Sequence, residues 1–262
     1  GANLIPLTKA NNGIRPIAVG CTWRRLAAKL AIKMLSDQAP EMLLPHQVGV
    51  GVPLGAEALT KATKKIANQN KNVEDFVIFT VDFSNAFNSV SRNAFLRETR
   101  IHFPQIYNWV RWCYSQPSNL IIAPGTTISS QEGAQQGDPL GPLLFSLALH
   151  PIAVRISKEI PNLKLNSWYL DDGTIAGSTR DVLKASKLIQ EAGMQIGLKM
   201  NLAKCSLYWP SYMNKKDKYN NDIFDSSIIR EEAGFRLLGI PIGSDEFCKS
   251  YFLKQIDNVT QM

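Results

Sequence analysis

Residues that cross-link a chain or hold a transition metal are scarce in these 262 residues, which include four cysteines and three histidines. The cysteines form no C-x-x-C pair, which excludes a disulfide-rich secreted domain and the common zinc-binding patterns. They are far apart, at Cys21, Cys113, Cys205 and Cys248. We therefore expect reduced core thiols in an intracellular protein, cytoplasmic or nuclear.

Long apolar runs are also absent. None reaches the roughly 18 residues of a membrane span, and residues 1–9 lack the charged-then-apolar layout of a signal peptide. The sequence therefore predicts no membrane partner. Charged residues make up only 19% of the chain and hydrophobic residues 45%. This composition excludes disorder for most of the chain and predicts one large domain or two modest ones.

The net charge of +7 is unevenly distributed. Residues 1–75 contain ten basic and five acidic residues, whereas the rest of the chain is nearly balanced. A basic region of this kind suggests a polyanionic partner such as a nucleic acid or a triphosphate. A merely soluble basic surface explains the same numbers, so charge alone leaves both interpretations open.

Apolar spacing and turn residues predict helices and strands that do not alternate strictly, which is the α+β class. Helices are predicted at 24–37, 56–68, after the N-cap Ser91, at 106–114, at 140–157 and at 181–192, where Gly193 caps the end. The continuous apolar run 76–81 predicts a strand buried on both faces. Hairpins are predicted at 119–129, 168–176 and 235–242, a Gly-rich loop at 45–51 and a polar loop at 210–225.

Three carboxylates stand beside apolar strands. Asp82 follows the run 76–81, and Asp171 and Asp172 lie in the turn of the hairpin 168–176. If these strands are neighbours in one sheet, the carboxylates converge and repel one another unless a cation lies between them. Oxygen ligands without nearby His or Cys favour magnesium or manganese, and two such ions activate a hydroxyl and stabilise a leaving phosphate. An ordinary strand end would explain Asp82 alone, and an ordinary turn would explain Asp171 and Asp172 alone. The occurrence of both in one chain favours a metal site.

These carboxylates lie in segments that resemble the ordered motifs of reverse transcriptases. The palm-like segments are 79–88, 135–142, the Tyr-Leu-Asp-Asp at 169–172, 197–204 and 238–239, and the fingers-like segments are 6–9, 15–17 and 24–29. The chain is most similar to the enzymes of non-LTR retrotransposons, and those of group II introns resemble it more than retroviral ones do. Tyr-Leu-Asp-Asp replaces the Phe-Ala-Asp-Asp more usual in non-LTR elements, and the resemblance covers nearly the whole chain to about Gly243.

The resemblance implies a right-hand polymerase with an antiparallel palm sheet backed by helices. Residues 1–75 would be a fingers-like basic region, 76–243 the palm with intervening fingers elements, and 244–262 the start of a thumb or a linker. The implied activity is RNA-directed DNA synthesis: extension of a DNA primer with dNTPs along an RNA template, with two Mg²⁺ ions, or Mn²⁺. Because patterned sequence begins directly at Gly1, we expect a fragment of a retrotransposon polyprotein with further domains.

The resemblance also implies catalytic roles. Asp82 and Asp171 would hold both metal ions together with the backbone carbonyl of Phe83, and Asp172 would be a weaker ligand. Adjacent residues of a strand point to opposite faces, so two neighbouring aspartates reach one site only because they lie in a turn. Lys204 would protonate the leaving pyrophosphate, although a strand-edge lysine is an equally ordinary interpretation.

The remaining roles concern substrate and nucleic acid. The resemblance assigns substrate binding to Lys9 and Arg15 at the triphosphate, Phe87 beneath the ribose, and Gln136 and Gly137 at the incoming nucleotide and template. It assigns nucleic-acid contacts to Arg24, Arg25, Lys29, and the primer grip Leu238 and Gly239. A solvated helix face and a plain turn are the ordinary alternatives for these five.

Two other functions stay open at this point. An RNA-dependent RNA polymerase shares the carboxylate arrangement, but usually has a small residue where this chain has Phe87. A domesticated, non-catalytic nucleic-acid-binding protein would be marked by loss of the aspartates, and all three are present.

Overall fold

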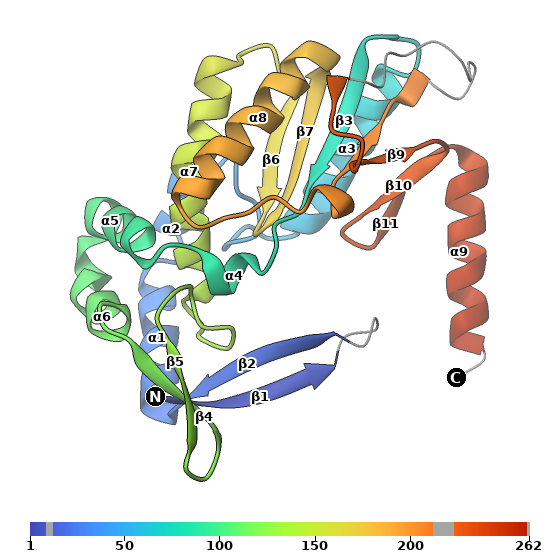
Figure 1. Ribbon diagram of the computed structural model, residues 1–262. Coiled ribbons are helices and arrows are strands. Elements are labelled where there is room, and N and C mark those ends of the chain that lie inside the picture. Colours follow the sequence, from blue (N-terminus) through green and yellow to red (C-terminus); the bar gives the residue numbers. More distant parts are fainter. Residues whose placement is uncertain (9–12, 212–222, 261–262) are drawn as a thin grey trace.

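The computed structural model describes residues 1–8, 13–211 and 223–260 (Figure 1). At its centre is a five-stranded sheet in the order β6-β7-β3-β8-β9. Its strands are β3 (Phe76–Val81), β6 (Leu165–Tyr169), β7 (Asp172–Ser178), β8 (Ser206–Tyr208) and β9 (Ile229–Glu231). All neighbouring strands are antiparallel except β8 and β9. The predicted antiparallel sheet is therefore confirmed, with one parallel pair at its edge.

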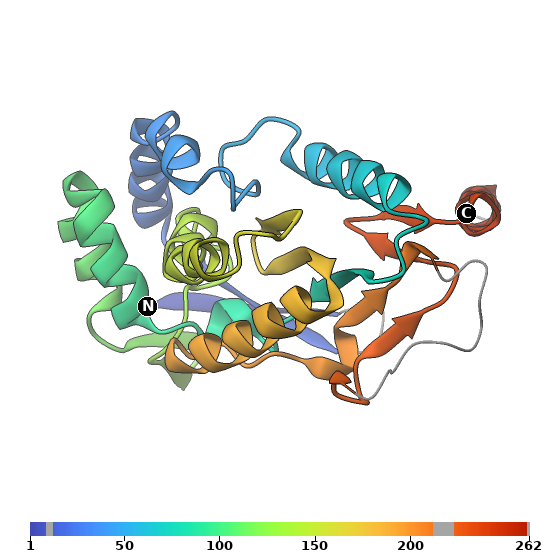
Figure 2. The same cartoon turned by 90° about the horizontal axis from the view of Figure 1, so that it is seen from above.

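Strand β3 is buried on both faces, as its continuous apolar sequence predicts. Because alternate side chains point to opposite faces of a sheet, Val77 and Phe79 pack in one hydrophobic cluster, and Phe76 and Ile78 in another. Two of the helices that contribute to the first cluster, and a third helix and a hairpin that contribute to the second, surround the central sheet in Figure 2. These elements are α7 (Gly141–Glu159) and α8 (Thr179–Gln195), then α3 (Gly55–Gln69) and the strands β10 (Gly234–Leu237) and β11 (Ile240–Gly243).

Local sequence signals account for several helix boundaries. The predicted N-cap Ser91 precedes α5 (Arg92–His102), and its Oγ accepts a hydrogen bond from the backbone N–H of Ala94 at 3.3 Å. Proline at the first position of a helix loses no hydrogen bond, and Pro104 begins α6 (Pro104–Tyr114). The predicted helices at 106–114 and 140–157 are confirmed within about two residues as α6 and α7.

A second, four-stranded sheet has the order β2-β1-β4-β5. Its strands are β1 (Ala2–Thr8), β2 (Ile14–Gly20), β4 (Ser118–Ala123) and β5 (Thr126–Ser130). The hairpin β4–β5 is predicted by sequence, but β1–β2 is not, and both of its strands contain a proline, which is unfavourable inside a sheet. Here Pro6 and Pro16 lie opposite each other, and β1 pairs with β4 only at Ala2 and Asn3. Pro6 therefore lies beyond the pairing with β4, and no ladder bond to β4 is lost there.

The predicted helix 24–37 is shorter in the structure. Helix α1 (Thr22–Met34) ends at Met34, and the short α2 (Gln38–Leu43) follows. The face of α1 that packs on the core carries Ala28 and Ala31, whereas the larger Leu26 and Leu30 are exposed.

Two sequence predictions are wrong. Gly193 does not cap α8: the helix continues to Gln195, and Gly193 lies where an added Cβ would come 3.0 Å from the Leu198 carbonyl oxygen. The close approach of the chain at Leu198, rather than termination of the helix, favours glycine there. Of the cysteines expected in the core, Cys113 and Cys205 are buried, but Cys21 is exposed.

The last described element, α9 (Asp245–Thr260), packs against β11 and otherwise stands apart from the sheets (Figure 1). The predicted loop 210–225 lies mostly outside the described residues. Within the described ranges, no helix has the length and apolar character needed to cross a membrane.

Candidate active site

The structure brings the three aspartates to one cavity. Asp82 directly follows β3, and the antiparallel register that places Val81 opposite Gly173 puts it beside the turn containing Asp171 and Asp172. All three line a cavity of about 590 Å³. The same cavity is lined by most of the predicted catalytic and substrate residues, namely Arg15, Phe83, Phe87, Gln136, Gly137 and Lys204.

The carboxylates of this cavity disfavour one another's ionisation. Burial, together with the negative charges of Asp171 and Asp82, raises the pKa of Asp172 to about 6. Burial also raises the pKa of Asp171, with the charge of Asp82 adding to it and that of Arg15 opposing it. A divalent cation between the carboxylates would offset this repulsion. Hard oxygen donors fit Mg²⁺, although no group of three or more metal-binding side chains is preassembled among the described residues.

The chain after β3 is fixed by the segment 199–205. The backbone carbonyl of Asp82 accepts a hydrogen bond from the N–H of Asn201 at 2.8 Å, and the backbone N–H of Asp82 donates one to the Cys205 sulfur at 3.4 Å. Phe83 is buried, and its ring stacks on Trp168 with centroids 6.0 Å apart. Lys204 follows in a short 3-10 helix, η1 (Leu202–Lys204), and is exposed at the cavity.

Gln47 is a positioning residue that sequence reasoning missed. Leu170, directly before Asp171, has a left-handed backbone with φ of 56°, a conformation that costs energy in a non-glycine residue. The Gln47 side chain accepts a hydrogen bond from the Leu170 N–H at 2.7 Å and donates one to the Leu170 carbonyl at 3.1 Å. Gln47 is 3% exposed. The sequence shows Gln47 within the Gly-rich loop 45–51, but no local pattern indicates that its hydrogen-bond partner lies 123 residues away.

Phe87 forms one wall of the cavity. It lies in the short helix α4 (Ala86–Ser89), is half-buried, and stacks on Phe145 of α7 with ring centroids 4.8 Å apart. A ring held against a fully buried neighbour does not move aside readily. The position of this wall is therefore fixed by the core.

The segment with Gln136 and Gly137 is attached to β2. The Gln136 carbonyl accepts a hydrogen bond from the N–H of Ala18 at 2.6 Å. Gly137 has φ of 111°, and a Cβ there would lie 2.7 Å from the Ala18 carbonyl oxygen. The sequence suggested that this glycine allows a nucleotide to approach, and the structure adds a second reason, the close approach of β2.

Asp138 is the centre of a buried polar network. Its Oδ2 accepts hydrogen bonds from the Tyr114 hydroxyl at 2.7 Å and from Arg24 at 3.2 Å, and its Oδ1 accepts one from the Leu140 N–H at 2.9 Å. The guanidinium groups of Arg24 and Arg92 lie 5.3 and 5.4 Å from the centre of the Tyr114 ring. The Arg24 side chain, only 12% exposed, is thus engaged within the protein.

We expect Asp138→Asn to lower the free energy of unfolding by about 3 kcal/mol, because it leaves the Arg24 charge buried without a counter-charge. Urea denaturation measures this change. The matched control is Asp37→Asn, which removes an exposed carboxylate near the start of α2 and should have almost no effect. Equal stability of the parent and Asp138→Asn would mean that the ion pair contributes nothing.

The other predicted residues lie away from the cavity or outside the description. Lys9 is not among the described residues. Arg25 and Lys29 are exposed on α1, and neither lines the cavity. Leu238 and Gly239 form the turn between β10 and β11, with φ of 47° and 88°, and the Gly239 carbonyl accepts a hydrogen bond from the Tyr251 hydroxyl at 3.0 Å. The nucleic-acid roles of all these residues stay predictions.

Known proteins with similar sequences come from retrotransposons. The "Retrotransposable element SLACS 132 kDa protein" of Trypanosoma brucei gambiense is 28% identical over 215 residues, 77% of this chain and 17% of that protein. The "Retrovirus-related Pol polyprotein from type-1 retrotransposable element R2" of Nasonia vitripennis is 28% identical over 162 residues, 57% of this chain and 16% of that protein. The chain thus spans less than a fifth of the length of these relatives.

Solved structures of telomerases have the same fold. One from Candida albicans, in complex with a fragment of telomeric RNA, matches with a TM-score of 0.65 at 10% identity, over 94% of this chain and 46% of that one. The apo telomerase of Candida tropicalis, truncated from its C-terminal domain, gives 0.59 at 14% identity, over 92% and 53%. These matches confirm the predicted fingers-palm polymerase fold.

The model of one protein family covers most of the chain, including the residues that line the catalytic cavity. It is described as "Reverse transcriptase (RNA-dependent DNA polymerase)" and matches residues 7–242. Together with the retrotransposon relatives, this match confirms the resemblance suggested by the sequence motifs. The chain belongs to the reverse transcriptase family.

Proposed function

We propose that this chain extends the 3′-hydroxyl of a DNA primer with dNTPs along an RNA template, as the polymerase region of a retrotransposon polyprotein. The observation that supports it is the cavity in which Asp82, Asp171 and Asp172 meet Arg15 and Lys204. Carboxylates can bind cations that hold a triphosphate, and basic side chains nearby can bind its phosphates directly. The family is RNA-dependent by description, which supports an RNA template.

The proposed metal ligands are Asp82, Asp171, the carbonyl of Phe83 and, more weakly, Asp172. Reverse transcriptases as a family generally depend on divalent cations, and we propose two Mg²⁺ ions, which Mn²⁺ can replace. When bound, such ions activate the attacking hydroxyl and stabilise the leaving phosphate. The protein holds the carboxylates in place through β3, the β6–β7 turn and Gln47.

The other residues of the cavity receive roles by charge and position. Arg15, with Lys9, binds the triphosphate, and Lys204 donates a proton to the departing pyrophosphate. Gln136 and Gly137 border the incoming nucleotide, and Phe87 lies beneath its sugar. Outside the cavity, Arg25 and Lys29 bind the template backbone, and Leu238 and Gly239 bind the primer end. Arg24 contributes to template binding only in the position that its ion pair with Asp138 gives it.

We also propose the division of the chain that the motifs suggest. Residues 1–75 are a fingers-like basic region, 76–243 the palm with intervening fingers elements such as β4 and β5, and 244–262 the start of a thumb or a linker. In support, β1 and β2 share a sheet with β4 and β5, and α9 stands apart. Within the first region, α2 and α3 pack against α7 and β6 of the palm.

Primer extension on an RNA template in Mg²⁺, with either dNTPs or ribonucleotides, tests the proposed activity. The expected result is DNA synthesis that requires the template and stops when the cation is removed with a chelator. A parent protein that prefers ribonucleotides would instead be an RNA polymerase. No extension with either pool would support a non-catalytic nucleic-acid-binding protein.

We expect this chain alone to bind a primer-template duplex weakly and with strong salt dependence. After β11 the described chain contributes only α9, so charge supplies most of the binding, and affinity should fall at least about tenfold between 50 and 200 mM salt. Fluorescence anisotropy of labelled duplex measures this. Tight binding that is insensitive to salt would contradict the expectation.

Two matched variants locate the contacting surface. Arg25→Gln should reduce the slope of log affinity against log salt by about one if Arg25 contacts a phosphate. Lys158→Gln serves as control, because Lys158 lies in the last turn of α7 while the cavity is lined by Gly141 and Pro142 of the first turn. An equal slope for both variants would remove Arg25 from the nucleic-acid surface.

A further inference from the structure

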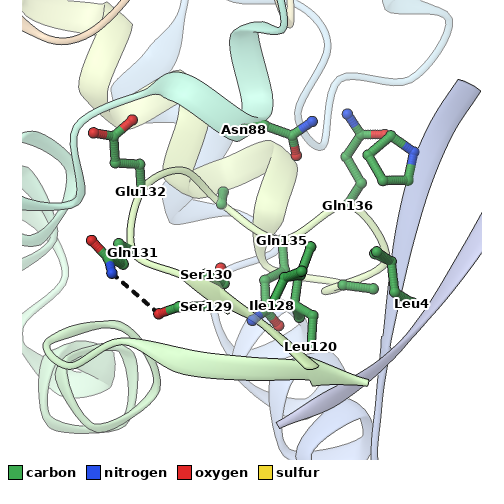
Figure 3. A pocket seen from close by; sticks show the side chains of 13 residues that line it. Leu4, Asn88, Leu120, Ile128, Ser129, Ser130, Gln131, Glu132, Gln135 and Gln136 are labelled. Atoms are coloured by element: carbon green, nitrogen blue, oxygen red, sulfur yellow. Dashed lines mark hydrogen bonds between the residues drawn. The ribbon is translucent and has the colours of Figure 1, made fainter. Parts of the chain in front are cut away.

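We propose that a second cavity, next to the catalytic one, binds the unpaired template base just ahead of the templating nucleotide. This inference rests on the proposed polymerase function. The cavity has a volume of about 410 Å³ and is bordered by the second sheet, α4 and the segment 129–136 (Figure 3). Gln135 and Gln136 line this cavity and the catalytic one. The two cavities are therefore separated by a single stretch of chain.

The walls of the second cavity are apolar on one side. Leu4 of β1, Leu120 of β4 and Ile128 of β5 contribute side chains, and Ile128 is 45% exposed. In Figure 3, Leu120 and Ile128 lie on the side of the cavity opposite Asn88 and Gln136. An apolar surface of this kind suits the face of a flat ring.

The opposite side carries amide groups. Asn88 and Gln136 are both half-buried. No hydrogen bond to either side-chain amide is found among the described residues, whereas the neighbouring Gln135 is satisfied by Ser118 at 2.9 Å. An amide donates and accepts at once, as the edge of a nucleobase does, and Asn and Gln are the usual partners of adenine edges. Two such groups facing an apolar wall match a base held by its edge and its face.

The charge of the cavity excludes a phosphate as its main ligand. No lysine or arginine of the described chain lines it, and Glu132 is its one charged residue. A free dNTP needs cations for its triphosphate, and those lie in the catalytic cavity, at Arg15 and Lys204. The ligand that fits is therefore a neutral base whose backbone runs outside the cavity.

The position of the cavity favours the template strand over the primer. The primer end must reach Asp82 and Asp171, which line only the catalytic cavity. The templating base pairs with the incoming nucleotide at Gln136 and Gly137 in the proposed function. The next template nucleotide, still unpaired, then lies across the segment 135–137, where the second cavity opens.

The experiment compares primer-templates that differ by one template base. One RNA template ends at the templating nucleotide, a second has one further nucleotide, and a third has an abasic nucleotide at that position. With this chain and a saturating next dNTP, we expect the extra base to tighten binding about tenfold, because its face is buried against the aliphatic wall of the cavity, and the abasic nucleotide to lose that gain. Anisotropy gives the affinity, and single-nucleotide addition gives the rate.

Variants assign the gain to the cavity. Ile128→Ala and Asn88→Ala should each remove most of the tenfold gain and leave the affinity for the shortest template unchanged. Ile121→Ala is the matched control, because Ile121 is an isoleucine of the same hairpin, 43% exposed, that does not line the cavity. A loss that is the same on all three templates would show a structural effect and overturn the proposal, as would equal affinity for the second and third templates.

Failure of this proposal and failure of the proposed function give different results. A parent that extends the primer but is indifferent to the extra base is a polymerase without this base site. A parent that extends no primer in Mg²⁺ contradicts the proposed function itself, and the base site with it.

Discussion

Asp82→Asn and Asp171→Asn should each abolish primer extension, with a loss of at least about 10³-fold in rate, while the fold persists. Each substitution removes one ligand charge from the site proposed to hold the cations, and charge stabilisation of this kind is the largest single contribution to many enzymatic rates. Asp172→Asn should weaken metal binding less. Single-turnover extension on an RNA template, at several Mg²⁺ concentrations, measures all three.

Stability serves as the internal control for these variants. Because Asp82 and Asp171 raise the pKa of Asp172, loss of one negative charge relieves repulsion in the metal-free protein. The melting temperature should therefore stay equal or rise slightly. Asp37→Asn, which lies outside the cavity, should change neither rate nor melting temperature. Near-parental extension by Asp82→Asn or Asp171→Asn would contradict the two-metal interpretation.

Phe87→Ala and Phe87→Val should admit ribonucleotides, raising their incorporation relative to dNTPs by about 100-fold. A wall that cannot relax discriminates against a 2′-hydroxyl by steric exclusion alone, and Phe87 is fixed by stacking on Phe145. Primer extension with each nucleotide pool, compared as kcat/KM, measures the ratio. The same assay on the parent separates DNA synthesis from RNA synthesis.

The conservative variant Phe87→Tyr is the control for this prediction. It keeps the ring against Phe145 and should keep the parental preference for dNTPs. Truncation also removes packing at a half-buried site, so the melting temperature of each variant is measured beside its rates. If Phe87→Ala lowered the use of both nucleotide pools by the same factor, Phe87 would be a core aromatic and not a gate.

Local patterns predicted much of the central sheet. The run 76–81 contains no polar interruption apart from Thr80, which predicts burial on both faces, and the structure places hydrophobic clusters on both sides of β3. The convergence of Asp82 with Asp171 followed from one assumption, that the strand and the hairpin are neighbours. Short-range signals sufficed because each of these features is encoded within about ten residues.

Features that depend on distant partners were not predicted. Strands β1 and β2 contain prolines, and only their register shows that Pro6 lies beyond the pairing with β4. The role of Gln47 depends on a contact with Leu170, and that of Arg24 depends on Asp138. The second cavity is formed by residues from five segments of the chain. A polar residue in a sequence does not identify the group that will satisfy it.

The contact between Gln47 and Leu170 has a consequence for the order in which the chain assembles during synthesis. Strand β3 needs β7 and β8 as neighbours, and the Asp171 turn needs Gln47. The carboxylates of the proposed site are therefore held by contacts between residues about 90 to 130 positions apart in the sequence. Contacts of such long range form late in folding. A nascent chain that has not yet emerged beyond Tyr208 therefore has no complete site. The proposed nucleotide site is therefore complete only once β8 has paired with β3.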